Sequence, residues 1–379
     1  MKKILAIVLA LTFVCTMLVG CGGTAGGGFE IALITDKGNI DDKSFNQGSW
    51  EGVVEFAREN NITHKYYKPE EDSDAGYLAA IDLAVTGGAK VVVTPGYLFE
   101  VPVYEAQTKY PDVKFILLDG EPHAAGSFDI DSKENVASIK YSEEEPGYLA
   151  GYAAVADGYK KLGFMGGMAV PAVQAYGYGY LQGAEAAATK LGLEDGSISV
   201  IYHYTGDFAE TDTNKATAKT MYQEGTEVIF ACGGSVGKSV MAAATEAGKK
   251  VIGVDTDQRY DSETVITSAM KSLGGSVKQV LEAIYKNNNW SAYAGKTTYL
   301  NASNNSIGLP TVVIGDEKAD AFDRFKTFKK ADYDALYKSL TDGSVKIIRS
   351  INVADPTGVA TADELVSSLN LKKVTVTVR

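Results

Sequence analysis

The chain has 379 residues, with 36 basic and 48 acidic side chains and a formal net charge of −12. This acidic balance, together with the lack of any basic run, excludes electrostatic binding of nucleic acid as the main function. The length exceeds what one hydrophobic core usually covers, so the sequence predicts two lobes.

The first residues have the pattern of an export signal. Two lysines precede an apolar stretch over residues 4–17, and the sequence LVGC then ends at Cys21. We therefore expect a signal peptide over residues 1–20, with an uncleaved anchor as the alternative, and a lipid on Cys21 that holds the protein to the outer side of the cell membrane. Residues 21–28 would form the lipidated cysteine and a flexible glycine-rich tether. Cys232 would then be the sole free thiol of the mature chain, which predicts no internal disulfide.

Apolar, β-rich runs alternate with helical patterns over most of the chain. Strands separated by helices indicate parallel sheets that are covered on both faces. About ten strands are too many for one wound sheet of ordinary size. They divide into two similar series at about residue 145, starting near residues 30, 62, 90, 113 and 135 in the first and 162, 197, 227, 250 and 265 in the second.

The two series predict an α/β protein with two doubly wound parallel-sheet lobes. We expect the N-terminal lobe to contain residues 29–143 plus 265–302, and the C-terminal lobe to contain residues 144–264 plus 303–379. The chain would cross three times between them, which forms a hinge. Ligands of open parallel sheets bind at the carboxyl ends of the strands, so the cleft between the lobes is the predicted site. No function is predicted for the last part of the chain, from residue 343 onward.

The stretch TDKGNIDDKSFNQGSWEG, at residues 35–52, places three aspartates after the first strand. Their spacing does not follow the alternating oxygen pattern of a calcium loop, so no metal site is predicted. Ser44 and Gln47 are spaced as a capping box, and Asp41 and Asp42 would face the positive end of the next helix. These four residues are therefore expected to start that helix.

Other polar and aromatic residues remain as candidate ligand contacts. Asp36 lies at the tip of the first strand, and Phe45 lies off the apolar stripe of the following helix. Phe208, in a loop of the second lobe, could stack on the other side of a flat ligand. Asp255 and Lys271 end two strands and could share the adjacent hydroxyls of a ribose. The alternative is that the two rings only cover the core as a lid and that Lys271 is a solvated strand end.

The stretch CGGSVGKS, at residues 232–239, offers two enzymatic alternatives. It follows a strand and opens a helix, as a phosphate-binding loop does, but Cys232 occupies the place of the first glycine. It also contains the G-x-S-x-G pattern of a hydrolase around Ser235, and in that class the histidine follows the serine. All three histidines precede Ser235. We therefore expect no enzyme, with an NTPase or a hydrolase as a remote alternative.

Three motifs together match a known family. Behind the lipoprotein signal, TDKGNIDDKSFNQGSWEG is followed by ACGGSVGKSVMAAATEAGKKVIGVDTDQ and ITSAMKSL. In this order they resemble the basic membrane protein family of lipoproteins, whose best understood members are purine nucleoside receptors of ABC transporters. The resemblance covers most of residues 30–300. It implies a type I periplasmic-binding-protein fold that closes around one purine nucleoside and passes it to a permease and its ATPase.

The resemblance also implies roles for residues of the first motif and of the strand tips. Asp36 and Asp119 would form hydrogen bonds with the purine. Phe45 and Phe208 would stack on its two faces. Of these four, Asp119 is marked by the residues alone only as a strand tip.

The ribose contacts implied by the resemblance lie in the second and third motifs. Asp255 and Lys271 would hold the ribose, with a backbone contact from Gly233 or Gly234. No cofactor is expected, and the receptor would act as a monomer. Two stretches, PGYLFE and HYTGDFAETDTNK, depart from the usual versions of the family. Riboflavin or another flat heteroaromatic is therefore an alternative ligand, and a ligand sensor is an alternative role.

Overall fold

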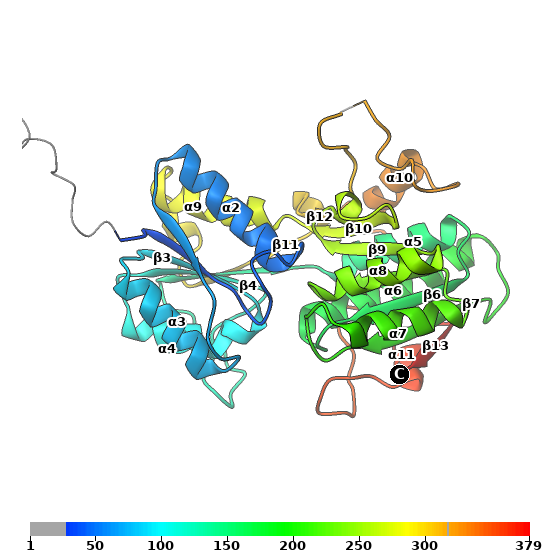
Figure 1. Cartoon of the computed structure of the whole chain (residues 1–379), viewed down its shortest axis with the longest axis horizontal. Coiled ribbons are helices and arrows are strands. Elements are labelled where there is room, and N and C mark those ends of the chain that lie inside the picture. The colour runs from blue at the N-terminus through cyan, green and yellow to red at the C-terminus, as the bar shows by residue number, and fades with distance from the viewer. Residues whose placement is uncertain (1–27, 317) are drawn as a thin grey trace, which may run out of the picture.

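The computed structural model describes residues 28–316 and 318–379, which form two lobes side by side (Figure 1). Each lobe has a mainly parallel sheet with helices on both faces, as the alternation of strands and helices predicts. The predicted signal peptide, the predicted lipidation site Cys21 and the tether up to Gly27 lie outside the described residues. Within the described residues, no helix is both long enough and apolar enough to cross a membrane.

The first lobe contains a six-stranded parallel sheet in the order β11-β5-β4-β3-β1-β2. Successive residues of a strand face opposite sides, so Ile31 and Leu33 pack in the cluster with α2, and Ala32 and Ile34 pack in the cluster with α3. The strands are β1 (Ile31–Ile34), β2 (His64–Tyr67), β3 (Val91–Pro95), β4 (Lys114–Leu118), β5 (Val136–Tyr141) and β11 (Lys296–Leu300). The helices are α2 (Phe45–Glu59), α3 (Asp74–Thr86), α4 (Glu100–Lys109) and α9 (Leu273–Tyr285), with short 3-10 turns η1 (Tyr97–Phe99) and η3 (Trp290–Ala292).

The second lobe contains a seven-stranded sheet in the order β12-β10-β9-β8-β6-β7-β13, in which only the β10–β12 pair is antiparallel. Helices α5 and α6 pack on one face and helices α7 and α8 on the other. The strands are β6 (Lys161–Gly166), β7 (Ile198–Tyr204), β8 (Val228–Cys232), β9 (Lys250–Asp255), β10 (Val265–Lys271), β12 (Ile307–Gly308) and β13 (Val374–Val378). The helices are α5 (Glu144–Ala156), α6 (Pro171–Lys190), α7 (Asp212–Gln223), α8 (Val236–Ala247), α10 (Lys330–Thr341) and α11 (Ala362–Ser368), with 3-10 turns η2 (Gln258–Tyr260) and η4 (Ala302–Asn304).

Helices α5 and α6 approach each other backbone to backbone. A Cβ atom added to Gly151 of α5 would lie 2.0 Å from the carbonyl oxygen of Tyr180, and one added to Gly183 of α6 would lie 2.0 Å from that of Tyr148. Only glycine allows this separation, since real Cβ contacts are never so short. The close packing fixes α6, whose first turns line the space between the lobes.

The chain crosses three times between the lobes, but one predicted boundary is wrong. Strand β10 was expected to open the return to the first lobe at residue 265. Instead it pairs in parallel with β9, from Val265 opposite Val251 to Met270 opposite Asp255, inside the second sheet. The return takes place after Lys271, where α9 begins and packs on α2. A buried strand has the same apolar pattern in either sheet, so its sequence does not show which sheet it joins.

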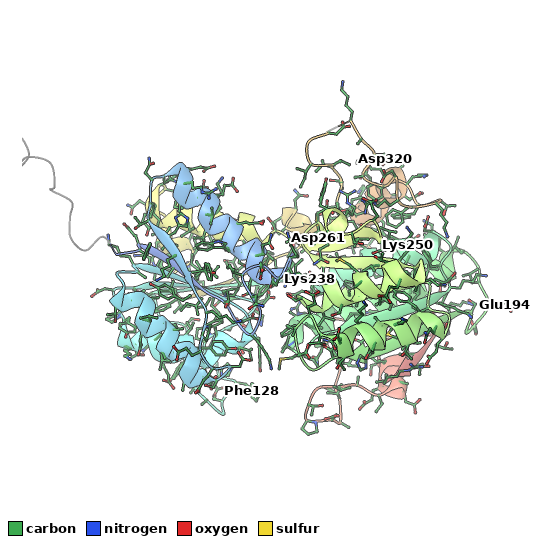
Figure 2. All side chains as sticks on the ribbon, in the orientation of Figure 1. Phe128, Glu194, Lys238, Lys250, Asp261 and Asp320 are labelled. Carbon is green, nitrogen blue, oxygen red and sulfur yellow. The ribbon has the colours of Figure 1, made fainter. Side chains whose placement is uncertain are left out.

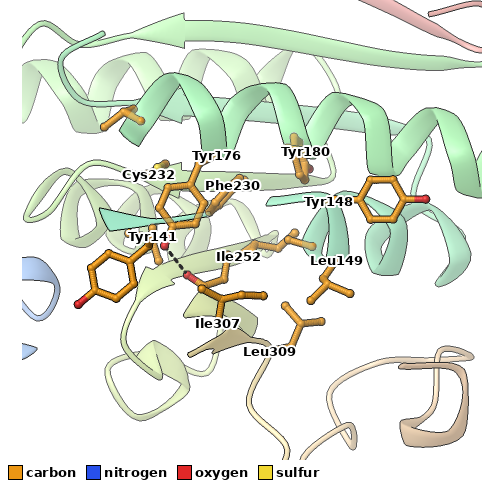
Figure 3. Packing of buried hydrophobic residues seen from close by; sticks show 14 of the residues in the cluster. Tyr141, Tyr148, Leu149, Tyr176, Tyr180, Phe230, Cys232, Ile252, Ile307 and Leu309 are labelled. Carbon is orange, nitrogen blue, oxygen red and sulfur yellow. Dashed lines mark hydrogen bonds between the residues drawn. The ribbon is translucent and has the colours of Figure 1, made fainter. Parts of the chain in front are cut away.

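One apolar cluster continues from the first sheet through the crossings into the second lobe. Figure 3 shows part of it, with Tyr141 at the end of β5 and Tyr176 on α6. Tyr176 packs edge to face on Phe230, with ring centroids 5.8 Å apart, and Cys232 belongs to the same cluster. Tyr176 and Cys232, which face the space between the lobes, therefore belong to the packed core.

The segment after α10 runs along the outside of the second lobe. Gln174 on α6 donates from its amide to the Gly358 carbonyl at 2.6 Å. Beyond α11, strand β13 adds to the edge of the sheet by pairing in parallel with β7. The last part of the chain thus forms part of the second lobe.

Candidate ligand-binding cleft

A cavity lies between the lobes, where strands of both sheets end. Its empty volume, which includes space open to solvent, is about 660 Å³. All eight residues predicted as ligand contacts line this cavity: Asp36, Phe45 and Asp119 from the first lobe, and Phe208, Gly233, Gly234, Asp255 and Lys271 from the second. The structure thus brings the predicted residues together, and their contacts with a ligand remain predictions.

The two aromatic candidates come from opposite lobes. Phe45 is the first residue of α2, and Phe208 lies in the loop between β7 and α7. Phe208 packs directly on Gly167, because a Cβ atom added there would lie 2.4 Å from two carbons of the ring. Gly234 lies nearby, where an added Cβ would be 3.6 Å from the Phe208 Cβ. Gly167 therefore determines where the Phe208 ring stands.

Asp36 is held by the residues that follow it. Its Oδ1 accepts hydrogen bonds from the Gly38 amide and from Asn46 Nδ2, each at 2.8 Å. Burial raises the pKa of the Asp36 carboxyl to about 6, although both hydrogen bonds lower it. Gly96, with a φ of +124°, passes so close that an added Cβ would lie 3.1 Å from Asp36 Oδ2. Within the described residues Oδ2 accepts no hydrogen bond, so it is available to a donor in the cavity.

The predicted capping box at the start of α2 is wrong. Asp42 caps the helix instead, since its carboxylate accepts from the amides of Ser44 at 2.8 Å, Asn46 at 3.0 Å and Gln47 at 3.0 Å. Ser44 makes no side-chain cap bond, and its hydroxyl donates to Asp255 Oδ2 at 2.5 Å. An aspartate has two acceptor oxygens and can satisfy several orphan amides of the first turn, which leaves the serine free to reach the other lobe.

Lys271 lies among three carboxylates in the wall of the cavity. Its Nζ donates to Asp119 Oδ2 at 2.5 Å and lies 3.5 Å from Glu143 Oε1 and 3.8 Å from Asp255 Oδ1. The same nitrogen lies 4.7 Å from the centroid of the Phe45 ring. Burial lowers the pKa of Lys271, but the carboxylates outweigh it and hold the pKa above its ordinary value. The lysine is therefore a charged donor that connects the two lobes.

Asp119 and Asp255 both have strained backbones. Their φ angles are +57° and +64°, in the left-handed region, which costs on the order of 1 kcal/mol or more for residues other than glycine and is concentrated at functional sites. Burial raises the pKa of Asp119 to about 7 against the opposing effect of Lys271, and Asp119 Oδ1 is buried without a hydrogen-bond partner among the described residues. Asp119 thus lies beside the pair predicted at the ribose, whereas the resemblance implied a purine contact.

The loop before α2 also contacts the second lobe. The Lys43 carbonyl accepts a hydrogen bond from Gln258 Nε2 at 2.8 Å, and the Asp41 carbonyl accepts one from Lys238 Nζ at 2.8 Å. Figure 2 shows Lys238 and Asp261 at the boundary between the lobes, and the Asp261 carboxylate lies 3.7 Å from Lys43 Nζ. These contacts join the two lobes.

The side chains that would act in a hydrolase or an NTPase lie outside the cavity lining. Ser235 and Lys238 are absent from the cavity lining, and Lys238 is engaged with the first lobe. The histidines are dispersed over β2, a loop of the first lobe and β7. Among residues 28–316 and 318–379, no group of three or more histidine, cysteine or acidic side chains could hold a metal ion.

Several cavity residues were missed in the sequence. Asn46 and Tyr97 line the cavity from the first lobe, and the position of Asn46 directly after Phe45 could have marked it. Tyr176 also lines it and donates to the Ala269 carbonyl at 3.3 Å. Nothing in the tyrosine-rich sequence of α6 distinguishes Tyr176 from its buried neighbours, so only the fold identifies it.

Comparison with known protein families identifies the family of this chain. Residues 29–359 match the family described as ABC transporter substrate-binding protein, PnrA-like. The chain belongs to this family. The predicted resemblance to the basic membrane proteins is thereby confirmed. The family, also called Bmp, consists of ABC transporter substrate-binding proteins, and substrate-binding proteins of ABC importers are extracytoplasmic.

The sequences of relatives align with most of this chain. The ABC transporter nucleoside-binding protein BmpA of Lactococcus lactis subsp. cremoris is 29% identical over 357 residues, which cover 86% of this chain and 96% of the relative. Basic membrane protein A1 of Borrelia garinii subsp. bavariensis is 29% identical and covers 88% and 92%. A solved ABC solute-binding protein from Aeropyrum pernix K1 has a TM-score of 0.74 and 22% identity, and covers 90% and 97%. This structural match confirms the predicted periplasmic-binding-protein fold.

Proposed function

We propose that this protein is the receptor of an ABC importer and captures purine nucleosides such as adenosine, guanosine and inosine between its lobes. The observation that carries the proposal is the lining of one cavity by an aromatic ring from each lobe and by carboxylates around a buried lysine. The name of the Lactococcus lactis relative, a nucleoside-binding protein, supports the same ligand class. The permease and ATPase of the importer are the proposed partners.

The base would lie between Phe45 and Phe208. Stacked aromatic contacts of this kind contribute about 0.5–1.5 kcal/mol each beyond burial. Asp36 Oδ2 would accept a base N–H, since this oxygen accepts no hydrogen bond within the described residues. Asn46 lies beside Asp36, with its amide nitrogen already donating to the Asp36 carboxylate. A flat ring with N–H groups on one edge therefore suits this end of the cavity.

The ribose would lie at the other end, beside Lys271. Its adjacent hydroxyls can donate to Asp255 and to Asp119 Oδ1, which has no hydrogen-bond partner among the described residues, while one of them accepts from Lys271. Gly233 and Gly234 follow β8 and line the cavity with backbone. We assign Asp119 to the ribose end because it pairs with Lys271, in place of the purine contact implied by the resemblance.

Delivery to a permease requires the receptor to remain near the membrane. We propose that cleavage before Cys21 leaves a lipidated cysteine and a short glycine-rich tether, both outside the described residues. The two lobes would act as a monomer on this anchor. Labelling the expressed protein with a radioactive or clickable fatty acid tests the anchor, and labelling that persists in Cys21→Ser would contradict it.

The ligand is tested by what the protein carries and binds. We expect mass spectrometry of freshly purified, denatured protein to release a purine nucleoside, and titration calorimetry to show inosine binding at least about tenfold tighter than hypoxanthine. In Asp255→Ala this preference for the nucleoside should shrink. Release of a flavin would support the riboflavin alternative. ATP hydrolysis that is lost in Lys238→Ala would support the NTPase alternative, and either result would overturn the proposal.

A further inference from the structure

Arg349, from the C-terminal segment, reaches the first crossing between the lobes. Its Nη1 donates to the Tyr141 carbonyl at 2.7 Å and to Glu144 Oε2 at 2.5 Å, and its Nη2 donates to Glu143 Oε2 at 2.5 Å. Tyr141 ends β5, and Glu143 and Glu144 begin α5. One guanidinium therefore contacts both sides of the crossing, although it lies 208 residues after Tyr141 in the chain.

The backbone beside Arg349 is fixed on α6. The Ile348 amide donates to Gln182 Oε1 at 2.8 Å, and Gln182 Nε2 donates to the Ile348 carbonyl at 2.9 Å. This two-sided amide pairing holds the residue before Arg349 in one place. The arginine consequently loses less conformational freedom when it reaches the crossing, so its ion pairs are preorganised.

Glu143 is shared between Arg349 and the lysine of the ligand cavity. Its Oε2 accepts from Arg349, while its Oε1 lies 3.5 Å from Lys271 Nζ. The Glu143 side chain is 1% exposed and that of Lys271 is 2% exposed, so solvent screens neither charge. Burial raises the pKa of Glu143, but Lys271 and Arg349 outweigh it and keep the pKa below its ordinary value.

Asp119 and Glu143 both lie within reach of the Lys271 ammonium. With Arg349 in place, Lys271 donates to Asp119 at 2.5 Å and, over the longer distance of 3.5 Å, to Glu143. Without Arg349, Glu143 would be a buried carboxylate with Lys271 as its nearest cation. Coulomb attraction between close, buried charges would then draw the ammonium toward Glu143 and away from Asp119 and Asp255.

We propose that Arg349 is a positioning residue of the nucleoside site. By pairing with Glu143, Arg349 keeps Lys271 between Asp119 and Asp255, where Lys271 can bind the ribose hydroxyls. The proposal rests on the proposed function. Arg349 itself lines a smaller hollow, of about 310 Å³ empty volume, that shares Asp119 with the main cavity. If Arg349 only stabilised the crossing, its replacement would lower stability without changing the preference for nucleoside over free base.

Titration calorimetry with inosine and hypoxanthine separates these roles. We expect Arg349→Gln to weaken inosine binding about tenfold or more and hypoxanthine binding less than about threefold, with Arg349→Lys between Arg349→Gln and the wild type. The matched control is Arg379→Gln, since Arg379 is another arginine of the C-terminal segment and pairs with Glu224 at the surface. Both affinities should be unchanged in the control.

Each other outcome counts against the proposal. Unchanged inosine affinity in Arg349→Gln, or equal losses for inosine and hypoxanthine, overturns the positioning role and leaves the proposed function standing. If the wild-type protein binds neither compound, the proposed function fails and the positioning role fails with it. If Arg349→Gln does not fold, Arg349→Lys gives the same comparison, and an unchanged ratio of the two affinities overturns the proposal.

Discussion

Lys271 of the second lobe donates to Asp119 of the first at 2.5 Å, and both side chains are nearly buried, with 2% and 8% exposed. Both residues line the cavity, one from each lobe, yet Asp119 keeps one oxygen without a partner in the described residues. Glu143 and Asp255 lie within 3.8 Å of the same ammonium. We propose that the adjacent hydroxyls of a ligand bind at this cluster, because their donors match the excess of carboxylate oxygens.

Removal of the ammonium should therefore act on the sugar end of the ligand. We expect Lys271→Gln to weaken inosine binding by about 2–5 kcal/mol, because three buried carboxylates lose their shared cation. Titration calorimetry measures this loss, and thermal unfolding shows how much stability is lost as well. Lys160→Gln, at an exposed position of the second lobe, is the control. An inosine affinity that survives in Lys271→Gln would remove the lysine from the site.

The stacking arrangement can be tested without touching either ring. Gly167→Ala should displace the Phe208 ring, since the added Cβ would lie 2.4 Å from it, and we expect this change to weaken inosine binding by about 1–3 kcal/mol. Phe208→Ala and Phe45→Ala should give losses of the same size. Gly237→Ala, where the added Cβ would make only ordinary contacts at 3.8 Å or more, is the control for folding. Full affinity in both phenylalanine variants would contradict stacking.

The sequence predicted those parts of the site that lie in local patterns. Asp36 and Phe45 were identified because a strand tip and a helix start are both visible in the sequence, and neither residue had a structural role left to fill. Phe208, Asp255 and Lys271 were found in the same way in the second lobe. All five line one cavity, which follows from the rule that parallel strands place their carboxyl ends at one edge.

Other features depend on contacts that are distant along the chain. Ser44 was assigned to helix capping because its spacing from Gln47 fits, but Asp42 performs that role and Ser44 contacts Asp255, 211 residues away. Strand β10 was assigned to the first lobe because an apolar strand pattern carries no information on its neighbours. Arg349 had no sequence signal, since its partners become adjacent only when the C-terminal segment packs on α6.

Ligand affinity should rise with pH between about 5 and 8. Burial raises the pKa of Asp36 to about 6 and that of Asp119 to about 7, and the ionised carboxylates accept from N–H and O–H groups more strongly than the protonated groups do. Inosine binding therefore releases protons. Protonation of Asp36 alone should weaken inosine binding about tenfold at pH 5 relative to pH 8. Calorimetry in buffers of different protonation enthalpy measures the released protons.

The stability of the ligand-free protein should follow the opposite trend. A carboxyl whose pKa is raised on folding stabilises the folded state below its unfolded pKa of about 3.8, and this contribution is lost as the pH rises through the folded pKa. Asp36 and Asp119 thus predict a decline in stability between about pH 4 and 7. Asp36→Asn should remove part of both the decline and the proton release, and an unaltered profile would contradict this assignment.

Ser44 and Asp42 allow closure of the lobes to be separated from folding of α2. Ser44→Ala removes the 2.5 Å bond to Asp255 but leaves the helix start capped by Asp42. We expect inosine to dissociate faster and to bind about 1–2 kcal/mol more weakly, with little change in the unfolding temperature. Asp42→Ala should instead lower stability by about 0.5–2 kcal/mol, because the amide of the N-cap residue Ser44 and two amides of the first turn lose their acceptor. Stopped-flow dissociation and thermal unfolding of both variants measure the two effects. If Ser44→Ala loses stability and keeps its dissociation rate, the serine supports the helix and not the closed cleft.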